Sequence, residues 1–219
     1  MIALDQVHLS FADNGRVLPV LEDVSLQVGA GASCAVIGPS GCGKTSLLFL
    51  LAGLLKPTAG TVRVADRSRT GVILQHYGLL PWKSVAANIA LGLRLQGADR
   101  ERTRARVDEL LAHFGLSGHR DHPAHLLSGG QKQLLALASV LITSPQLIIM
   151  DEPTTLLDLR NAKMIGRVIR ELPQTVVLAT HHLYLLEDFD RVLVFDSGHL
   201  VADAAPAEAL AHYRKLMDA

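Results

Sequence analysis

A glycine-rich loop between an apolar strand and an apolar helix constrains this 219-residue chain more than any other feature. Residues 33–37 are short and apolar, and residues 38–45 fit the pattern G-x-x-x-x-G-K-[ST]. Residues 47–55 predict a buried helix that stops around Lys56 and Pro57. Glycines let backbone N–H groups turn inward onto phosphate oxygens, and the positive end of the helix points at them. The sequence therefore predicts a phosphate-binding loop.

Two side chains of this loop have predicted chemical roles. Lys44 can reach the β- and γ-phosphates of a nucleotide, and the Thr45 hydroxyl can ligate Mg²⁺. An ordinary glycine-rich turn is the alternative, and the flanking strand and helix argue against it. The loop residues that we expect to bind nucleotide are Gly38, Pro39, Ser40, Gly41, Cys42, Gly43, Lys44, Thr45 and Ser46.

A second apolar strand ends in two carboxylates. Residues 147–150 are Leu-Ile-Ile-Met, and Asp151 and Glu152 follow directly. Buried parallel strands place such groups at the carboxyl edge of the sheet, beside the phosphate loop. Asp151 then suits Mg²⁺, directly or through water, and Glu152 suits the attacking water as a general base. The alternative is that Asp-Glu-Pro simply ends a strand or caps a turn.

The segment Leu-Ser-Gly-Gly-Gln at residues 127–131 carries two successive glycines at the start of a predicted helix. Ser128 with Gln131 three residues later also fits a plain capping box, which is the structural alternative. Glycines are poor helix formers, each costing about 1 kcal/mol against alanine, so a cap alone does not explain Gly129 and Gly130. A close approach of the backbone to an anion at a helix N-terminus does explain them.

Strand and helix patterns alternate along the rest of the chain. Residues 7–11 and 17–28 predict strands joined by a turn at Asp13-Asn14-Gly15, and residues 147–150, 175–179, 191–195 and 199–201 predict further strands. Helices are expected at 85–95, 100–114, 128–143, 159–172 and 206–217. This order predicts an α/β domain with a mainly parallel sheet, N-terminal antiparallel strands and an inserted helical region. We expect one domain, with 1–77 and 145–219 as the nucleotide-binding core and 78–144 as the helical subdomain.

Composition limits the classes of protein. Twenty-one basic residues balance 21 acidic ones, so the broad basic surface of a nucleic-acid binder is not expected. The longest apolar runs are far shorter than the ~20 residues of a membrane-spanning helix, and the N-terminus lacks a signal-peptide pattern. Two cysteines give no disulfide framework and fit a reducing cytoplasm.

These motifs together resemble ABC-type ATPases along essentially the whole chain. The resemblance implies the P-loop NTPase fold and a head-to-tail dimer of two ATPase subunits, identical or different. Each ATP would be held by the phosphate loop of one subunit and residues 127–131 of the other, where Ser128 and Gly130 would touch the γ-phosphate. The family also implies membrane-embedded permease subunits as partners, and a position on the inner face of the cell membrane.

The resemblance assigns roles to four more residues. Gln75 would sense Mg²⁺ and the attacking water, His181 would contact the γ-phosphate, and Phe11 would stack on adenine. Asp158 would lie in the loop exchanged between subunits. Relatives commonly have Tyr at position 11 and Asp at position 182, where this chain has His182; neither difference removes a group needed for hydrolysis.

The transported substrate is poorly encoded, because the ATPase of such a system does not contact the cargo. Residues 79–92 resemble the ATPases of nitrate, sulfonate and taurine importers, whereas 129–134, 151–161 and 187–194 resemble energy-coupling-factor ATPases of vitamin and metal uptake. We favour the second type. A soluble ABC ATPase that acts on nucleic acid is the alternative from another class.

A metal site is suggested by the spacing of His119, His122 and His125. Pro123 and the lack of a matching thiol favour a solvated connector instead.

Overall fold

The computed structural model describes residues 1–13 and 16–218, apart from the side chains of Asp13 and Asp188. The turn predicted at Asn14 and Gly15 therefore lies outside the described residues. Within the described ranges, no helix combines the length and the apolar character that crossing a membrane requires.

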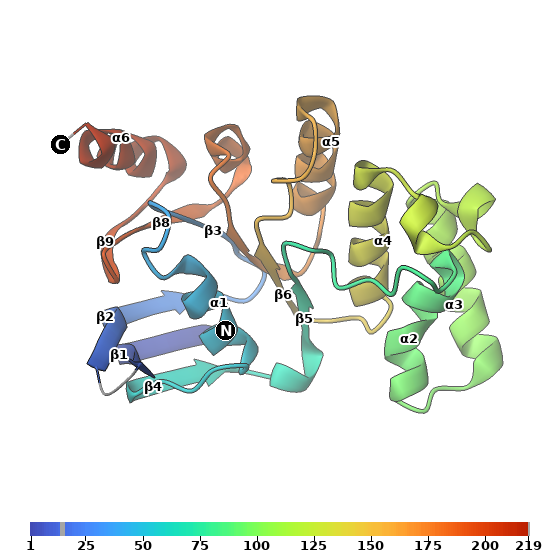
Figure 1. Ribbon diagram of the computed structural model, residues 1–219, viewed down its shortest axis with the longest axis horizontal. Coiled ribbons are helices and arrows are strands. Elements are labelled where there is room, and N and C mark those ends of the chain that lie inside the picture. Colours follow the sequence, from blue (N-terminus) through green and yellow to red (C-terminus); the bar gives the residue numbers. More distant parts are fainter. Residues whose placement is uncertain (14–15, 219) are drawn as a thin grey trace.

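The strands form two sheets (Figure 1). An antiparallel sheet has the order β2-β1-β4, made of β2 (Arg16–Val28), β1 (Ile2–Asp13) and β4 (Ala59–Val64). The second sheet has the order β5-β6-β7-β3-β8-β9, and its strands are β5 (Thr70–Ile73), β6 (Leu147–Asp151), β7 (Thr175–Ala179), β3 (Ser33–Ile37), β8 (Arg191–Asp196) and β9 (His199–Ala204). All its pairs are parallel except β8 with β9. The prediction of a mainly parallel sheet with N-terminal antiparallel strands is confirmed.

In the part of the chain that the structure describes, six α-helices cover the sheets or extend from them. They are α1 (Lys44–Ala52), α2 (Val85–Leu95), α3 (Arg100–His113), α4 (Gly129–Leu141), α5 (Leu159–Arg170) and α6 (Pro206–Met217). Short 3₁₀ turns lie at Arg67–Arg69, Ser117–His119, Ala124–Leu126 and Leu183–Asp188. Helix α1 lies between the two sheets, and α2, α3 and α4 stand together at one end of the molecule (Figure 1). The inserted helical region is thus present.

Alternation along the central strands builds a separate core on each face of the parallel sheet. In β6, Leu147 and Ile149 belong to the core around α1 and the antiparallel sheet. Ile148 and Met150 belong to the core that continues into α2, α3 and α4. A strand buried on both faces is continuously apolar, as the sequence of β6 is. The second core is continuous from the sheet into the helical insertion, while the boundaries at 78 and 144 remain a prediction.

The predicted bounds of one helix are wrong, and two strands were not predicted. Helix α1 begins at Lys44, inside the glycine loop, and ends at Ala52 rather than 55. It ends there because Gly53 takes a left-handed conformation (φ 75°) and donates its N–H back to the Leu50 carbonyl. Strands β4 and β5 are short, with six and four residues, and they form by pairing with strands distant in the sequence.

Candidate active site

The loop between β3 and α1 contains two positions that only glycine fits. Gly38 has φ 153°, and a Cβ there would lie 2.2 Å from the Phe195 carbonyl oxygen on β8. Gly43 has φ 103°, and its Cβ would lie 2.7 Å from a methyl carbon of Leu21 on β2. Gly43 is also the N-cap of α1 and supplies no side-chain acceptor. The loop is therefore seated against both sheets, and the first N–H groups of α1 are left for an acceptor from outside the helix.

Lys44 lies over this loop. Its Nζ donates hydrogen bonds to the carbonyl oxygens of Gly38 (2.8 Å) and Pro39 (2.9 Å). The ammonium is thus held by its own loop and faces the same cavity as the residues described next. A positive charge at this point is placed to attract phosphate oxygens.

Thr45 and Asp151 connect the phosphate loop to the end of β6. The Thr45 hydroxyl donates to Oδ2 of Asp151 at 2.9 Å. Asp151 is only 8% exposed, and burial raises the pKa of its carboxyl while the bond from Thr45 works in the opposite direction. A hydroxyl and a carboxylate within hydrogen-bond distance are oxygen ligands of the kind that Mg²⁺ takes, so the donor set fits that ion.

A cavity of about 420 Å³ brings the predicted residues together. It is lined by ten of the residues that the sequence singled out, namely Ser40, Gly41, Gly43, Lys44, Thr45, Ser46, Gln75, Asp151, Glu152 and His181. They come from the β3–α1 loop, the segment after β5, the end of β6 and the segment after β7. The carboxyl ends of three neighbouring strands therefore meet the phosphate loop at one edge of the sheet.

Glu152 is held by its backbone and by its side chain. It has φ 52°, a left-handed conformation unusual for a non-glycine residue, and its N–H donates to the Ala179 carbonyl at 2.9 Å. Its Oε2 accepts a bond from the Thr155 hydroxyl (2.9 Å) and lies 2.7 Å from Nδ1 of His181. Strained backbone that the surroundings hold in place is typical of functional sites.

Two lining residues were not predicted as part of the site. Thr155 bonds to Glu152, and its position three residues after that carboxylate is the only signal in the sequence. Val20 lines the cavity because the β1–β2 register changes between the pairs Leu9–Leu21 and Ser10–Pro19, which leaves Val20 as an extra residue. Such a bulge depends on strand pairing and has no signature in a single strand.

The second histidine after β7 has a structural environment of its own. Nδ1 of His182 lies 2.8 Å from the Thr154 hydroxyl, and its backbone N–H donates to Oγ1 of Thr180. Burial lowers the pKa of His182, and the neighbouring His181 lowers it further. His182 therefore stabilises the segment that carries His181, in a position that does not line the cavity.

Some predicted nucleotide-binding residues do not line the cavity. Gly38, Pro39 and Cys42 are absent from its lining; Cys42 is buried, and burial raises the pKa of its thiol. Phe11 lies near the far end of β1, opposite Leu18, and is 43% exposed. Its predicted stacking on adenine stays a prediction.

The segment 127–131 also lies apart from the cavity, at the start of α4. Ser128 is the N-cap of α4, its hydroxyl accepts from the Gln131 N–H, and Oε1 of Gln131 accepts from the Ser128 N–H. The capping box is therefore formed. A Cβ on Gly130 would lie 2.6 Å from Oδ1 of Asn161 on α5, so this glycine also permits close packing within the chain. Figure 1 shows α4 and α1 on either side of β5 and β6.

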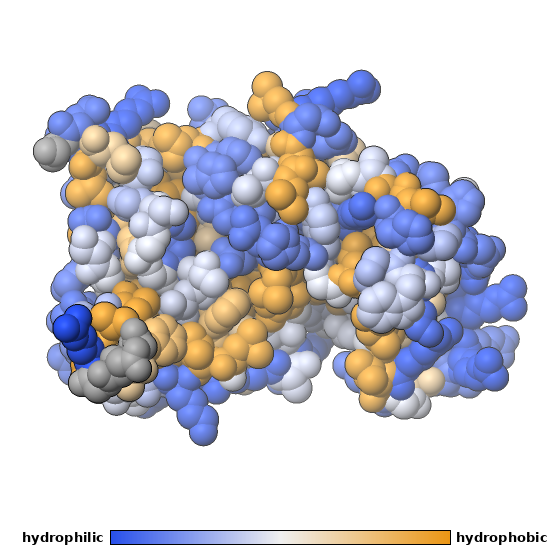
Figure 2. Space-filling model, viewed as in Figure 1, coloured by the Kyte–Doolittle hydropathy of each residue, from blue (hydrophilic) through white to orange (hydrophobic). Residues whose placement is uncertain are grey.

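Asp158 precedes α5 as its N-cap. Its carboxylate accepts from the backbone N–H of Asn161 at 2.9 Å and from the Asn161 side-chain amide at 2.7 Å. These bonds lower the pKa of the Asp158 carboxyl. Leu156 and Leu159 on either side of it are 53% and 60% exposed. Figure 2 shows apolar surface over the region of α5 in this view.

Comparison with known proteins identifies the family. A family model described as "ABC transporter" matches residues 21–155, more than half of the chain. The chain belongs to the ABC transporter family. Its fold is the one that this resemblance implied, and the chain is an ABC-type ATPase, the ATP-binding subunit of a transporter.

Similar proteins cover nearly the whole ABC ATPase chain. A putative ABC transporter ATP-binding protein of Deinococcus radiodurans is 44% identical over 212 residues, which is 91% of this chain and 92% of that protein. The biotin transport ATP-binding protein BioM of Rhizobium etli is 42% identical over 208 residues, 90% of this chain and 92% of that protein. A dimeric post-hydrolysis structure of the ATP-binding cassette MJ0796, bound to ADP and Pi, has a TM-score of 0.85 at 26% identity, covering 94% of this chain and 99% of that one.

Proposed function

We propose that this ABC ATPase hydrolyses Mg-ATP in a composite site formed by two subunits and thereby drives uptake of a small molecule through membrane partners. The observation that carries the proposal is the cavity beside the phosphate loop, where Lys44, Thr45, Asp151, Glu152 and His181 lie together. The N–H groups at the start of α1 and the Lys44 ammonium would hold the phosphates.

The chain's own groups account for hydrolysis. The Glu152 carboxylate lines the cavity, where it can accept a proton from water, and His181 and Thr155 hold it in place through Oε2. Thr45, Asp151 and Gln75 would hold Mg²⁺, which when bound neutralises charge that develops on the phosphate oxygens. A positioned base typically contributes about 10²–10⁴-fold to rate.

Residues 128–130 and Asp158 are the parts of the proposed site that a second subunit would supply. Ser128, Gly130 and Asp158 do not line the cavity of their own chain, although the family resemblance assigns the first two to nucleotide. The exposed Leu156 and Leu159 lie beside Asp158, where a second subunit would bury them. ATP would then make contacts present only in the closed dimer, and loss of the γ-phosphate would remove them.

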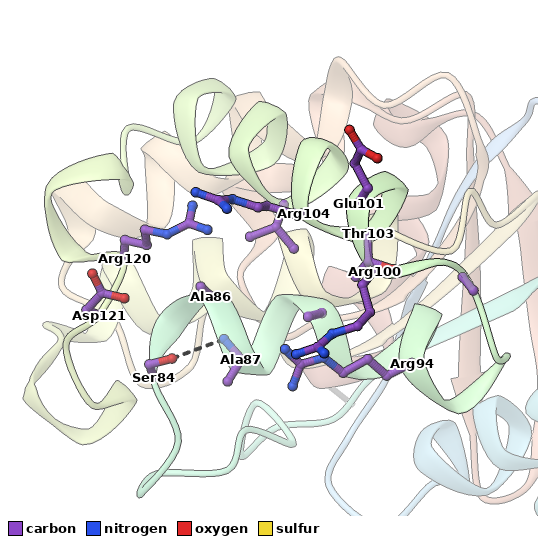
Figure 3. A pocket seen from close by; sticks show the side chains of 13 residues that line it. Ser84, Ala86, Ala87, Arg94, Arg100, Glu101, Thr103, Arg104, Arg120 and Asp121 are labelled. Carbon is purple, nitrogen blue, oxygen red and sulfur yellow. Dashed lines mark hydrogen bonds between the residues drawn. The ribbon is translucent and has the colours of Figure 1, made fainter.

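A groove between α2 and α3 is the proposed docking site for the membrane partner. Its volume is about 950 Å³, and small side chains including Ala87 and Ala90 form part of its wall. Four arginines line it, Arg94, Arg100, Arg104 and Arg120, against two carboxylates, Glu101 and Asp121 (Figure 3). Such a groove suits a cytoplasmic segment of a membrane subunit that carries carboxylates. The chain would then be cytoplasmic and peripheral to the membrane.

The substrate class rests on similarity. BioM is named for biotin transport and is 42% identical, which supports the energy-coupling-factor type of vitamin or metal uptake. The alternative is an importer of the nitrate, sulfonate and taurine type, favoured by residues 79–92.

Two measurements test the proposal. Calorimetry should show Mg-ATP binding that is lost in Lys44→Ala, because the charge over the loop is removed; unchanged affinity would overturn the phosphate-loop assignment.

Purification from detergent-solubilised membranes should recover a polytopic partner, and the double variant Arg94→Glu, Arg104→Glu should reduce that recovery. Arg63→Glu on the outer strand β4 is the matched control. Recovery on DNA or ribosomes instead of with a membrane protein would favour the nucleic-acid alternative.

A further inference from the structure

The start of α4 is joined by hydrogen bonds to the histidine segment that precedes it. The Ser128 N–H donates to Oε1 of Gln131 at 3.0 Å. Nε2 of Gln131 lies 3.0 Å from Nε2 of His119, and Nδ1 of His119 lies 3.1 Å from Nδ1 of His122. His119 is twelve residues from Gln131, in the turn Ser117–His119, so tertiary structure brings the two together.

The direction of these bonds follows from their one fixed donor. A backbone N–H can only donate, so the Gln131 oxygen is the acceptor and its amide nitrogen is the donor toward His119. Nε2 of His119 must then be the unprotonated nitrogen, which places its proton on Nδ1. That N–H donates to Nδ1 of His122, whose proton is therefore on Nε2. The geometry specifies a neutral tautomer for each histidine, and the two tautomers differ.

The bond from His119 fixes the Gln131 side chain in the position that caps Ser128. Without the bond to His119, one hydrogen bond fewer would hold the Gln131 side chain beside the Ser128 N–H. The Ser128–Gly130 backbone would then sample more conformations. Ordering a segment before association reduces the entropy that association costs. Two other side chains of this segment have different environments. Arg120 pairs with Asp108 on α3, and Asp121 is exposed.

We propose that His119 is a positioning residue that pre-orders residues 128–130, through Gln131, for the nucleotide bound to a second subunit. This inference rests on the composite site of the proposed function. His119 does not touch ATP in it; it acts through Gln131. His122 contributes by accepting the hydrogen bond from the Nδ1–H of His119, and so selects the His119 tautomer that can accept from the Gln131 amide.

Self-association in the presence of ATP tests this role. We use the Glu152→Gln chain, in which bound ATP should persist, and measure its dimer dissociation constant by sedimentation. His119→Ala should weaken the dimer by about 3- to 10-fold, the equivalent of one hydrogen bond. ATP affinity of the separate chain should not change, and the melting temperature should fall by only a few degrees, as expected for one lost hydrogen bond. His119→Gln should restore association, because its side-chain oxygen can accept from Gln131.

His125→Ala is the matched control. Nδ1 of His125 contacts the Pro81 carbonyl and takes no part in the connected bonds, so this variant should associate like its parent. Equal dimer affinity in the His119→Ala and His125→Ala chains would overturn the inference and leave the proposed function standing. Absence of ATP-dependent association in the Glu152→Gln parent itself would overturn the proposed function, and this inference with it.

Nitrogen NMR of the imidazole rings tests the geometry independently of dimer formation. We expect His119 to be protonated on Nδ1 and His122 on Nε2 at neutral to mildly alkaline pH. In Gln131→Leu the His119 tautomer should lose this preference, because its Nε2 acceptor role disappears. A His119 ring protonated on Nε2 in the parent chain would contradict the proposal.

Discussion

At the scale of single residues, Glu152 and Asp151 show how neighbouring carboxylates acquire different environments. Glu152 bonds to Thr155, lies beside His181 and has left-handed backbone. Asp151 is buried at the end of β6, and its bond from the Thr45 hydroxyl only partly offsets the burial that raises the pKa of its carboxyl. The first arrangement suits a base that meets water, and the second suits a ligand that becomes ionised when a cation is bound.

Glu152→Gln should retain ATP binding and lose turnover. The amide keeps the size of the side chain and the bond from Thr155, but it cannot take a proton from water. We expect phosphate release to fall by about 10²–10⁴-fold. Phosphate release and calorimetry on the same preparation separate the two effects. Turnover at the level of the unchanged chain would refute the role of Glu152.

Asp151→Asn should separate stability from function. A carboxyl whose folded pKa is raised favours the fold when protonated, and that contribution is lost as pH rises through the folded value. At neutral pH the neutral amide should therefore leave the free energy of unfolding, measured by urea denaturation without nucleotide, unchanged or higher. The advantage should shrink toward acid pH, where Asp151 is itself protonated. Mg²⁺ should no longer strengthen ATP binding; a Mg²⁺ effect of the original size would contradict the assignment.

At the scale of elements, the β1–β2 hairpin connects the antiparallel sheet to the site. The extra residue, Val20, lies on β2, so β1 keeps its period of two from Val7 through Leu9 to Phe11; Val7 and Leu9 are buried, whereas Phe11, nearer the end of the strand, is 43% exposed. The aromatic ring of Phe11 is therefore available to a ligand.

Phe11→Ala should weaken ATP binding by about 1–3 kcal/mol, the usual contribution of stacking on one base. Leu18→Ala is the matched control, because Leu18 lies opposite Phe11 in the hairpin and is similarly exposed. Fluorescence titration with a labelled ATP analogue measures both. An equal affinity in the two variants would place the adenine away from Phe11.

Elements with local signals were predicted closely, and those that depend on distant partners were not. Helix α2 was predicted with its observed bounds from its amphipathic pattern, and the structure adds Ser84 as its N-cap. Strands β4 and β5 carry no comparable signal. In the site, the contiguous motifs placed Lys44 and Glu152 correctly in one cavity, since each motif follows a buried strand. Val20 and Thr155 enter it through a bulge and a turn, which only the folded chain specifies.

At the scale of the whole molecule, the phosphate loop and the start of α4 face different surroundings. The cavity beside Lys44 is lined by the sheet edge, whereas Ser128, Gly129 and Gly130 lie at the N-terminus of α4 and do not line it. Two copies arranged head to tail would bring the start of α4 of one chain to the cavity of the other. The central claim is that the phosphate loop of one chain hydrolyses ATP only together with the start of α4 from another chain.

Mixing two inactive variants tests this claim most directly. Lys44→Ala removes the loop charge from one chain, and Ser128→Arg blocks the start of α4 in the other; circular dichroism should show that both are folded. A mixed dimer retains one intact site, made of Lys44 from one chain and Ser128 from the other. With random pairing, phosphate release should recover to about a quarter of the unchanged protein's rate. If the mixture stays as inactive as its two components, the composite site is contradicted.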